Sequence, residues 1–357
     1  MDMTPTEHVV RIMNDAWLGL LLSFGERLGL HEAMADGTPR TAEEIALAAD
    51  VNARYVQEWV WALVAGGIAD HTCSGPQEPT RFHLRPGYAA VLTPRGGPEH
   101  WSRITTQITA LGALEDELVE AARTGGGLPT SAYEGRIVEV LATESGPIFA
   151  TALLDEVVPL LGVHPALSSG VRVLDIGCGT GQALCLLAER YPTSTFIGCD
   201  QSPDSLDIAR ERVARLGLTN VTLHVLDVED GDDPLNTFEA PFHLVMAANV
   251  AHDLADPGTF FRRIRPLLAE DGVLYLHELG FVRDMAVNIT DPHAIGVLAF
   301  GLYHCLPLAM RRPGIAPGGM WGCESWVETL NAAGFPNVRV ERAPSDPNND
   351  TIIARLH

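Results

Sequence analysis

The sequence of 357 residues predicts an α/β protein: a mainly helical N-terminal part, then a doubly wound seven-stranded sheet. Three observations predict it. From residue 171 onward, short β-branched apolar runs alternate with segments of helical periodicity. The first of these runs, Val171–Gly181 (VRVLDIGCGTG), ends in an acid and a glycine turn. The chain closes on two extended runs around a short turn, which predicts a C-terminal antiparallel hairpin.

The first part of the chain predicts helices followed by a hairpin. A helix is expected over residues 12–35, where apolar residues share one face: Ile12, Ala16, Leu20 and Phe24. Thr41 with Glu44 three residues later forms a capping box that starts the next helix. A further helix is expected over Ala53–Ala65. The hairpin strands are expected at Ile68–His71 and Arg81–Leu84, around a Gly/Pro-rich tip, Ser74–Pro79.

This order of elements is that of a winged helix-turn-helix, so DNA binding has to be weighed. A DNA-reading helix needs basic residues, but the helix Ala53–Ala65 carries one Arg and one Glu. Residues 1–95 hold seven arginines against twelve acids. We therefore expect residues 1–95 to bind no nucleic acid. The apolar first helix suggests instead that they form a winged-helix dimerisation domain and that the protein is a homodimer. A transcriptional regulator that senses a ligand is the alternative of another class.

Residues 96–165 are expected to form a helical linker or lid. They are broken by Gly125–Gly127 and Pro129. Tyr133 and Glu134 follow the break and are candidates to reach a substrate, although a structural role is the simpler expectation.

The third segment, residues 166–357, carries the alternating pattern of parallel βαβ units. The expected elements lie at residues 171–176, 182–190, 195–199, 203–216, 221–226, 242–248, 258–268 and 273–279. A helix ending at Asn331–Phe335 and the strands Val338–Arg342 and Thr351–Arg355 complete the chain. Ligands of such sheets bind at the carboxyl ends of the strands.

The glycine turn points to a nucleoside-containing cofactor. Glycines let the backbone approach a ligand closely, and Asp200, at the end of the next strand, is placed to accept both hydroxyls of a ribose. The spacing Gly177, Gly179, Gly181 is not that of the dinucleotide fingerprint, and Asp175 would repel a pyrophosphate. A cationic ligand with an amino group fits better.

These residues resemble motif I of the class I S-adenosylmethionine (SAM) dependent methyltransferases, with further agreement downstream in LHVLDVED and LVMAANV. The resemblance implies a Rossmann-like SAM domain and a small-molecule substrate. It implies that Asp200 holds the ribose and Asp227 meets the adenine amino group. The implied cofactor-binding residues are Asp175, Gly177, Gly179, Gly181, Asp200, Gln201, Asp227, Val228 and Asn249.

Composition excludes several other partners. A net charge of −22 disfavours a phosphate-backbone partner. The six cysteines form no CxxC pair, and free thiols fit a cytoplasmic location. The N-terminus lacks a basic region, so no signal peptide is expected. The apolar run Ala16–Phe24 is too short to span a bilayer, and no membrane partner is expected.

The chemistry is expected just past the fourth and fifth strands, where His252, Asp253 and Glu278 lie; His304 lies in the insertion of residues 281–321. Three hypotheses remain open. His252 is a general base oriented by Asp253 or another acid. Alternatively, His252 and His304 bind a divalent or ferric ion, with Asp253 or Glu278 as third ligand. Finally, His252 caps the next helix and His304 is a packing residue.

The metal hypothesis rests on a resemblance to C-methyltransferases of arylpyruvates and branched α-keto acids. In these, a metal chelates the keto acid and acidifies its Cβ proton. The sequence thus predicts a SAM-dependent methyltransferase of secondary metabolism, in its sharpest form a metal-assisted C-methyltransferase of an α-keto acid. The alternative within this class is an O-methyltransferase of a phenolic or polyketide metabolite with His252 as base. A SAM-fold protein with changed chemistry also stays open.

Overall fold

The computed structural model describes residues 3–73, 75, 78–346 and 348–357. The chain forms two compact units, Met1–Ala113 and Leu114–His357. The predicted division at residues 1–95, 96–165 and 166–357 stays a prediction. The tip of the predicted hairpin falls partly on residues 74, 76 and 77, which lie outside the described residues.

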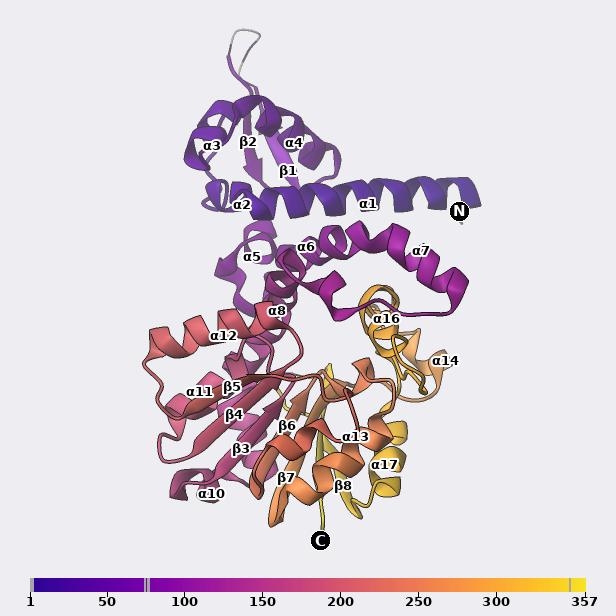
Figure 1. The fold of residues 1–357 in the computed structure, drawn as a ribbon. Helices are drawn as coiled ribbons and strands as arrows, with labels where there is room; N and C mark the ends of the chain where they lie inside the picture. Colours follow the sequence, from indigo (N-terminus) through magenta and orange to yellow (C-terminus); the bar gives the residue numbers. More distant parts are fainter. Residues whose placement is uncertain (1–2, 74, 76–77, 347) are drawn as a thin grey trace. The chain divides into compact units, whose positions relative to one another are not determined.

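The first unit is helical with one small hairpin (Figure 1). Thr41 caps α3 through the predicted capping box with Glu44. The hairpin strands pair antiparallel from Ala69↔Leu84 to Thr72↔Arg81. The elements are α1 (Pro5–Arg27), α2 (Leu30–Ala33), α3 (Ala42–Ala48), α4 (Ala53–Ala65), β1 (Ala69–Thr72), β2 (Arg81–Leu84), α5 (Tyr88–Leu92), η1 (Pro94–Glu99) and α6 (Ser102–Leu111). The predicted helix Ala53–Ala65 and the hairpin are confirmed.

The prediction of one helix over residues 12–35 is wrong. The first helix starts earlier, because Thr4 and Glu7 form a capping box at its N-terminus. It ends at Arg27, because Gly29 adopts a left-handed φ of 67° that a helix cannot continue through. A separate short helix, α2, follows.

The second unit contains the predicted seven-stranded sheet, in the order β5-β4-β3-β6-β7-β9-β8. The first five strands of that order are parallel, and β9 runs antiparallel to both β7 and β8. The strands are β3 (Arg172–Ile176), β4 (Thr195–Asp200), β5 (Val221–Val225), β6 (Phe242–Ala248), β7 (Leu268–Leu279), β8 (Asn337–Glu341) and β9 (Asn349–Arg355). The C-terminal hairpin is thereby confirmed.

Two apolar cores cover the two faces of this sheet. One core packs α13 (Pro257–Ile264) and α17 (Cys323–Ala332) on the sheet, and the other packs α11 (Gln182–Arg190), η4 (Phe149–Val157) and α9 (Val158–Leu161). The ribbons of α11, α13 and α17 lie beside the sheet in Figure 1. Alternate residues of one strand serve alternate faces, as Val173 and Leu174 do. Two further helices, α8 (Arg136–Ile148) and α10 (His164–Ser169), precede β3, and α12 (Pro203–Leu216) connects β4 to β5.

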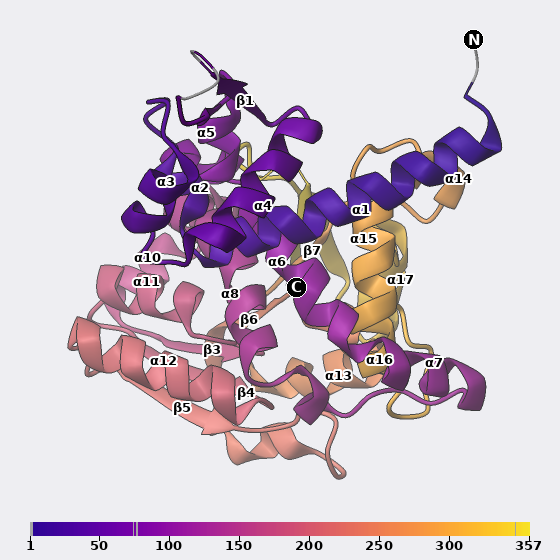
Figure 2. The ribbon, with the colours of Figure 1, turned by 90° about the horizontal axis from the view of Figure 1, so that it is seen from above.

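A helical insertion separates β7 from α17. It contains α14 (Met285–Asn288), α15 (Ala294–Phe300), η8 (Gly301–Cys305) and α16 (Leu306–Ala309), and the last three form one continuous helical stretch (Figure 2). This stretch packs near α7 (Glu115–Thr124) and the turn η3 (Thr130–Tyr133). In the described part of the chain, no helix has both the length and the apolar character needed to cross a membrane.

Candidate active site

The glycine turn follows β3 directly and requires its glycines. Gly177, Gly179 and Gly181 all have left-handed φ values, of 68°, 52° and 70°. A Cβ on Gly177 would lie 2.3 Å from Cγ2 of Val250, so this position excludes any side chain. The turn leads into α11 at the carboxyl edge of the sheet, and a Cβ added to Gly179 would meet no atom within 4 Å, so a ligand can approach the backbone there.

Asp200 ends β4 beside this turn. Its Oδ2 accepts the N–H of Gly179 at 2.8 Å, and its Oδ1 accepts the N–H of Ser202 at 2.9 Å. Burial raises the pKa of Asp200, and these hydrogen bonds oppose the rise by stabilising the carboxylate. Asp200 therefore fixes the turn as well as occupying the position predicted for a ribose partner.

Asp175 is buried at the end of β3. Burial, with the negative charge of Asp200 second, raises its pKa to about 8. A buried carboxyl with this pKa gains its charge most easily when a cation arrives beside it. That property suits the amino group that the sequence predicts for the ligand.

The other predicted cofactor residues lie at the same edge. Val228 is buried in the sheet core, and Asn249 follows β6 with a left-handed φ of 54°. Asp227 accepts a hydrogen bond from Arg312 at 2.8 Å, and the side chain of Gln201 accepts one from Arg311. The structure thus brings the predicted set together, and it adds two arginines that the sequence did not single out.

His252 lies in the short turn η6 (Ala251–Asp253) after β6. Its Nδ1 lies 2.5 Å from Oε2 of Glu278, whose Oε1 accepts the N–H of Ala251 at 3.0 Å. Both side chains are buried. Adjacent parallel strands explain the pairing: Ala248 of β6 is in register with His277 of β7, so the two strand ends lie side by side.

The charge state of His252 follows from these neighbours. Burial alone would lower its pKa, but the carboxylates of Glu278 and Asp253 outweigh burial and raise the pKa well above the ordinary value. The Nδ1–Glu278 contact fixes the ring orientation and leaves Nε2 as the reactive atom.

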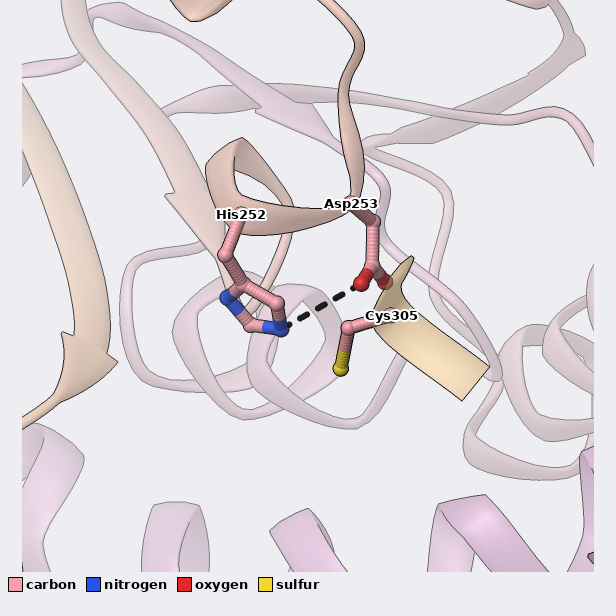
Figure 3. A group of neighbouring side chains, drawn as sticks. All are labelled: His252, Asp253 and Cys305. Carbon is pink, nitrogen blue, oxygen red and sulfur yellow. Dashed lines mark ion pairs between the residues drawn. The ribbon is translucent and has the colours of Figure 1, made fainter. Parts of the chain in front are cut away.

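Asp253 and Cys305 lie on the Nε2 side of His252 (Figure 3). The distance from Nε2 to Oδ1 of Asp253 is 3.4 Å. Ligand-type atoms of His252, Asp253 and Cys305 all lie within 4.8 Å of one another. Burial raises the pKa of the Cys305 thiol to about 12, so this sulfur is neutral in the metal-free protein.

His304 approaches the same group from η8 but stands further off. Its Nδ1 lies 3.9 Å from Oδ2 of Asp253. Its ring packs edge-on against Tyr133, with centroids 4.8 Å apart, and lies 5.2 Å from the ring of Phe300. Burial lowers the pKa of His304, so it is the neutral histidine of the two.

The sequence did not indicate Cys305, and it named Glu278 as a site residue without indicating that Glu278, rather than Asp253, contacts Nδ1 of His252. Cys305 directly follows His304, but nothing in a sequence says which side of a helix faces a site. The position of Glu278 carried a usable signal, because it ends the strand next to the one that precedes His252.

Both parts of the chain are similar to known protein families. Residues 167–294 match the model of a methyltransferase domain, and residues 16–94 match that of an Rv2258c-like winged HTH domain. Aklanonic acid methyltransferase DauC of Streptomyces sp. (strain C5) is 38% identical over 175 residues, which span 48% of this chain and 77% of that protein. The chain spans 32% of the uncharacterized protein RP028 of Rickettsia prowazekii, to which it is 34% identical over 80 residues.

Solved structures share the fold over nearly the whole chain. An O-methyltransferase family protein from Burkholderia thailandensis has a TM-score of 0.69 at 15% identity, over 99% of this chain and 98% of that one. Human N-acetylserotonin methyltransferase in complex with SAM has a TM-score of 0.63 at 16% identity, with the same coverage. The order of the strands, the glycine turn and the two family matches identify a Rossmann-like methyltransferase fold with an N-terminal winged-helix domain. Within that class, the chain belongs to the SAM-dependent methyltransferases.

Proposed function

We propose that this protein transfers a methyl group from SAM to a hydroxyl oxygen of a small molecule, with His252 as the general base. The observation that carries the proposal is the buried pair of His252 and Glu278 at the carboxyl edge of the sheet. Glu278 holds the Nδ1 side of the ring, so Nε2 is the atom available to a substrate. A histidine base suits the acidic proton of a hydroxyl, whereas the Cβ proton of an α-keto acid calls for activation by a Lewis acid. We therefore propose O-methylation rather than the α-keto acid C-methylation that the sequence suggested most sharply.

The reaction balances with the residues present. When bound, SAM supplies an activated methyl group on a cationic sulfur. Nε2 of His252 removes the acceptor's hydroxyl proton while the acceptor oxygen forms a bond to the methyl carbon and the carbon–sulfur bond breaks. Glu278 stabilises the imidazolium that results. The turn and Asp200 hold the cofactor, which makes alignment the other contribution of the protein.

The surroundings of His304 support an aromatic acceptor. The rings of Tyr133 and Phe300 flank it, and aromatic side chains pack well on planar ligands. The name of the relative DauC also supports a small-molecule acceptor. We accordingly propose a phenolic or polyketide metabolite as substrate, and a role in secondary metabolism in the cytoplasm.

The experiment is a transfer assay with methyl-labelled SAM and a panel of phenolic and polyketide acceptors. We expect His252→Ala to lose transfer by about 100-fold or more, because general base catalysis contributes at least that much. Its affinity for S-adenosylhomocysteine (SAH) should match that of the wild type. His293→Ala, an exposed histidine of the same insertion, is the matched control and should keep full activity. Full activity of His252→Ala would refute the proposed role.

Metal assistance is the second candidate, because Oδ1 of Asp253 is buried without a hydrogen-bond partner among the described residues and lies near His252 and Cys305. Histidine, carboxylate and thiolate together suit zinc or another transition metal. The residues that would hold the ion are then His252, Asp253 and Cys305, with His304 further away. Metal content before and after chelation, in the wild type and in Cys305→Ser, separates the candidates: the base mechanism predicts unchanged activity in metal-free enzyme.

A homodimer through the N-terminal unit is also proposed. Helix α1 exposes apolar side chains at helical spacing, which a partner surface would bury: Val9, Met13, Trp17, Leu20 and Phe24.

A further inference from the structure

Two arginines at the end of the helical insertion contact the residues assigned to adenosine. The NH1 group of Arg311 donates to Oε1 of Gln201 at 2.5 Å, and its NH2 group lies 3.5 Å from Oδ1 of Asp227. Arg312 donates to Oδ2 of Asp227 at 2.8 Å and to the carbonyl oxygen of Glu229 at 2.9 Å. The guanidinium of Arg311 therefore bridges Gln201, next to the acid predicted to bind the ribose, and Asp227, the acid predicted to bind adenine.

The Arg311 side chain is built into this place. It is only 12% exposed, and it also contacts Glu229, which is 11% exposed, at 3.4 Å. NH1 donates to the hydroxyl of Thr130 at 2.6 Å as well. Within the described residues, the Nε of Arg311 is buried and has no hydrogen-bond acceptor. A buried donor without a partner is costly, so a ligand that brings an acceptor would be favoured there.

Arg311 also connects the two ends of the site. It follows the helical stretch that carries His304 and Cys305. The same stretch is tied to the segment before α8: Leu128 donates its N–H to the carbonyl of Pro307 at 3.0 Å, and the Tyr133 hydroxyl donates to the carbonyl of Tyr303 at 2.9 Å. Arg311 therefore directly follows a helical stretch that is hydrogen-bonded to the segment of Leu128 and Tyr133.

We propose that Arg311 and Arg312 form a latch that closes on the adenosine end of the cofactor and joins it to the acceptor-side helix. The inference rests on the SAM site of the proposed function. The Nε–H of Arg311 donates to an acceptor atom of the adenosine, for which adenine nitrogens and ribose oxygens are suitable. Arg312 holds Asp227 in position. Arg311 is thus a cofactor-binding residue and Arg312 a positioning residue, and neither acts on the acceptor's proton.

The test compares two ligands by calorimetry. SAH contains both adenosine and the amino acid part, whereas 5′-methylthioadenosine contains the adenosine alone. Arg311→Ala should weaken both ligands by the same factor, on the order of 10-fold, because a charge-assisted hydrogen bond to the shared part is lost. Asp175→Asn should weaken SAH and leave methylthioadenosine unchanged.

Matched variants distinguish a role of Arg311 in cofactor binding from a purely structural role. Arg283→Ala removes an exposed arginine of the same insertion, paired with Glu328, and should leave both affinities unchanged. Arg311→Lys keeps the charge without the planar fork and should lie between Arg311→Ala and the wild type. Because Arg311→Ala leaves Glu229 without its cation, Arg311→Lys, which keeps the positive charge, and thermal unfolding of each variant check that the fold is retained.

A second readout tests the link to the acceptor side. SAH should slow amide hydrogen exchange of residues 301–310 in the wild type, and this protection should be lost in Arg311→Ala at saturating SAH. Equal affinities of Arg311→Ala and the wild type for methylthioadenosine would overturn the latch alone. Tighter binding would overturn it too, because the arginine would then occupy the adenine position. A wild-type protein that binds neither ligand would overturn the proposed function as well.

Discussion

At the scale of single residues, burial and neighbouring charge have opposite effects on the pKa of His252. Burial disfavours the imidazolium, but Glu278 and Asp253 favour it more strongly, which raises the pKa of His252 well above 6.5. In the ligand-free protein the ring is therefore protonated around neutral pH. Deprotonation has to precede proton abstraction, so activity is expected to depend on pH in a defined direction.

The expected pH profile follows from the raised pKa of His252. The base must be neutral, so kcat/KM should rise with pH through an apparent pKa above 6.5. Glu278→Gln removes the larger favourable charge, so the rise should move to lower pH while the maximal rate falls. The measurement is kcat/KM against pH for both proteins. A wild-type profile that rises below pH 6.5, or an unmoved profile in the variant, would contradict this account of His252.

At the scale of elements, local signals predicted most of the fold. The glycines at 177, 179 and 181 and the apolar runs around them were sufficient to place β3, α11 and β4. The capping box at Thr41 and Glu44 did the same for α3. The prediction of the first helix was wrong because Gly29 lies inside an apolar pattern that continues on both sides of it. Periodicity does not report a left-handed backbone.

Most of the predictable part of the site lies on strand ends, and His304 is the one predicted residue from the helical insertion. Asp175, Asp200 and Asp227 follow from strand order, because parallel strands bring their carboxyl ends to one edge. Arg311 and Cys305 come from the helical insertion, whose sequence shows no motif. Which side of α16 or η8 faces the site depends on packing against residues 127–133, far away in sequence. Long-range packing of this kind leaves no periodic signal.

At the scale of the whole molecule, the exposed apolar face of α1 predicts a dimer. Trp17 is 64% exposed and Met13 57%. Burying a large apolar side chain contributes about 1.5–3 kcal/mol, so Trp17→Glu should shift the equilibrium toward monomer. Sedimentation equilibrium of the full chain measures this. Leu47→Glu on α3, which changes an even more exposed apolar side chain outside α1, should remain dimeric. A wild-type chain that is monomeric at micromolar concentration would contradict the prediction.

The acids and glycines at the carboxyl edge of the sheet are proposed to hold SAM. Calorimetric titration with SAH tests this proposal most directly, in the wild type, in Asp200→Asn and in Asp207→Asn, an exposed acid of α12. We predict one SAH per chain, an unchanged affinity for Asp207→Asn, and a loss of about 10-fold or more for Asp200→Asn, because a partly buried charged hydrogen-bond acceptor is lost. Equal affinities of Asp200→Asn and the wild type would contradict the account.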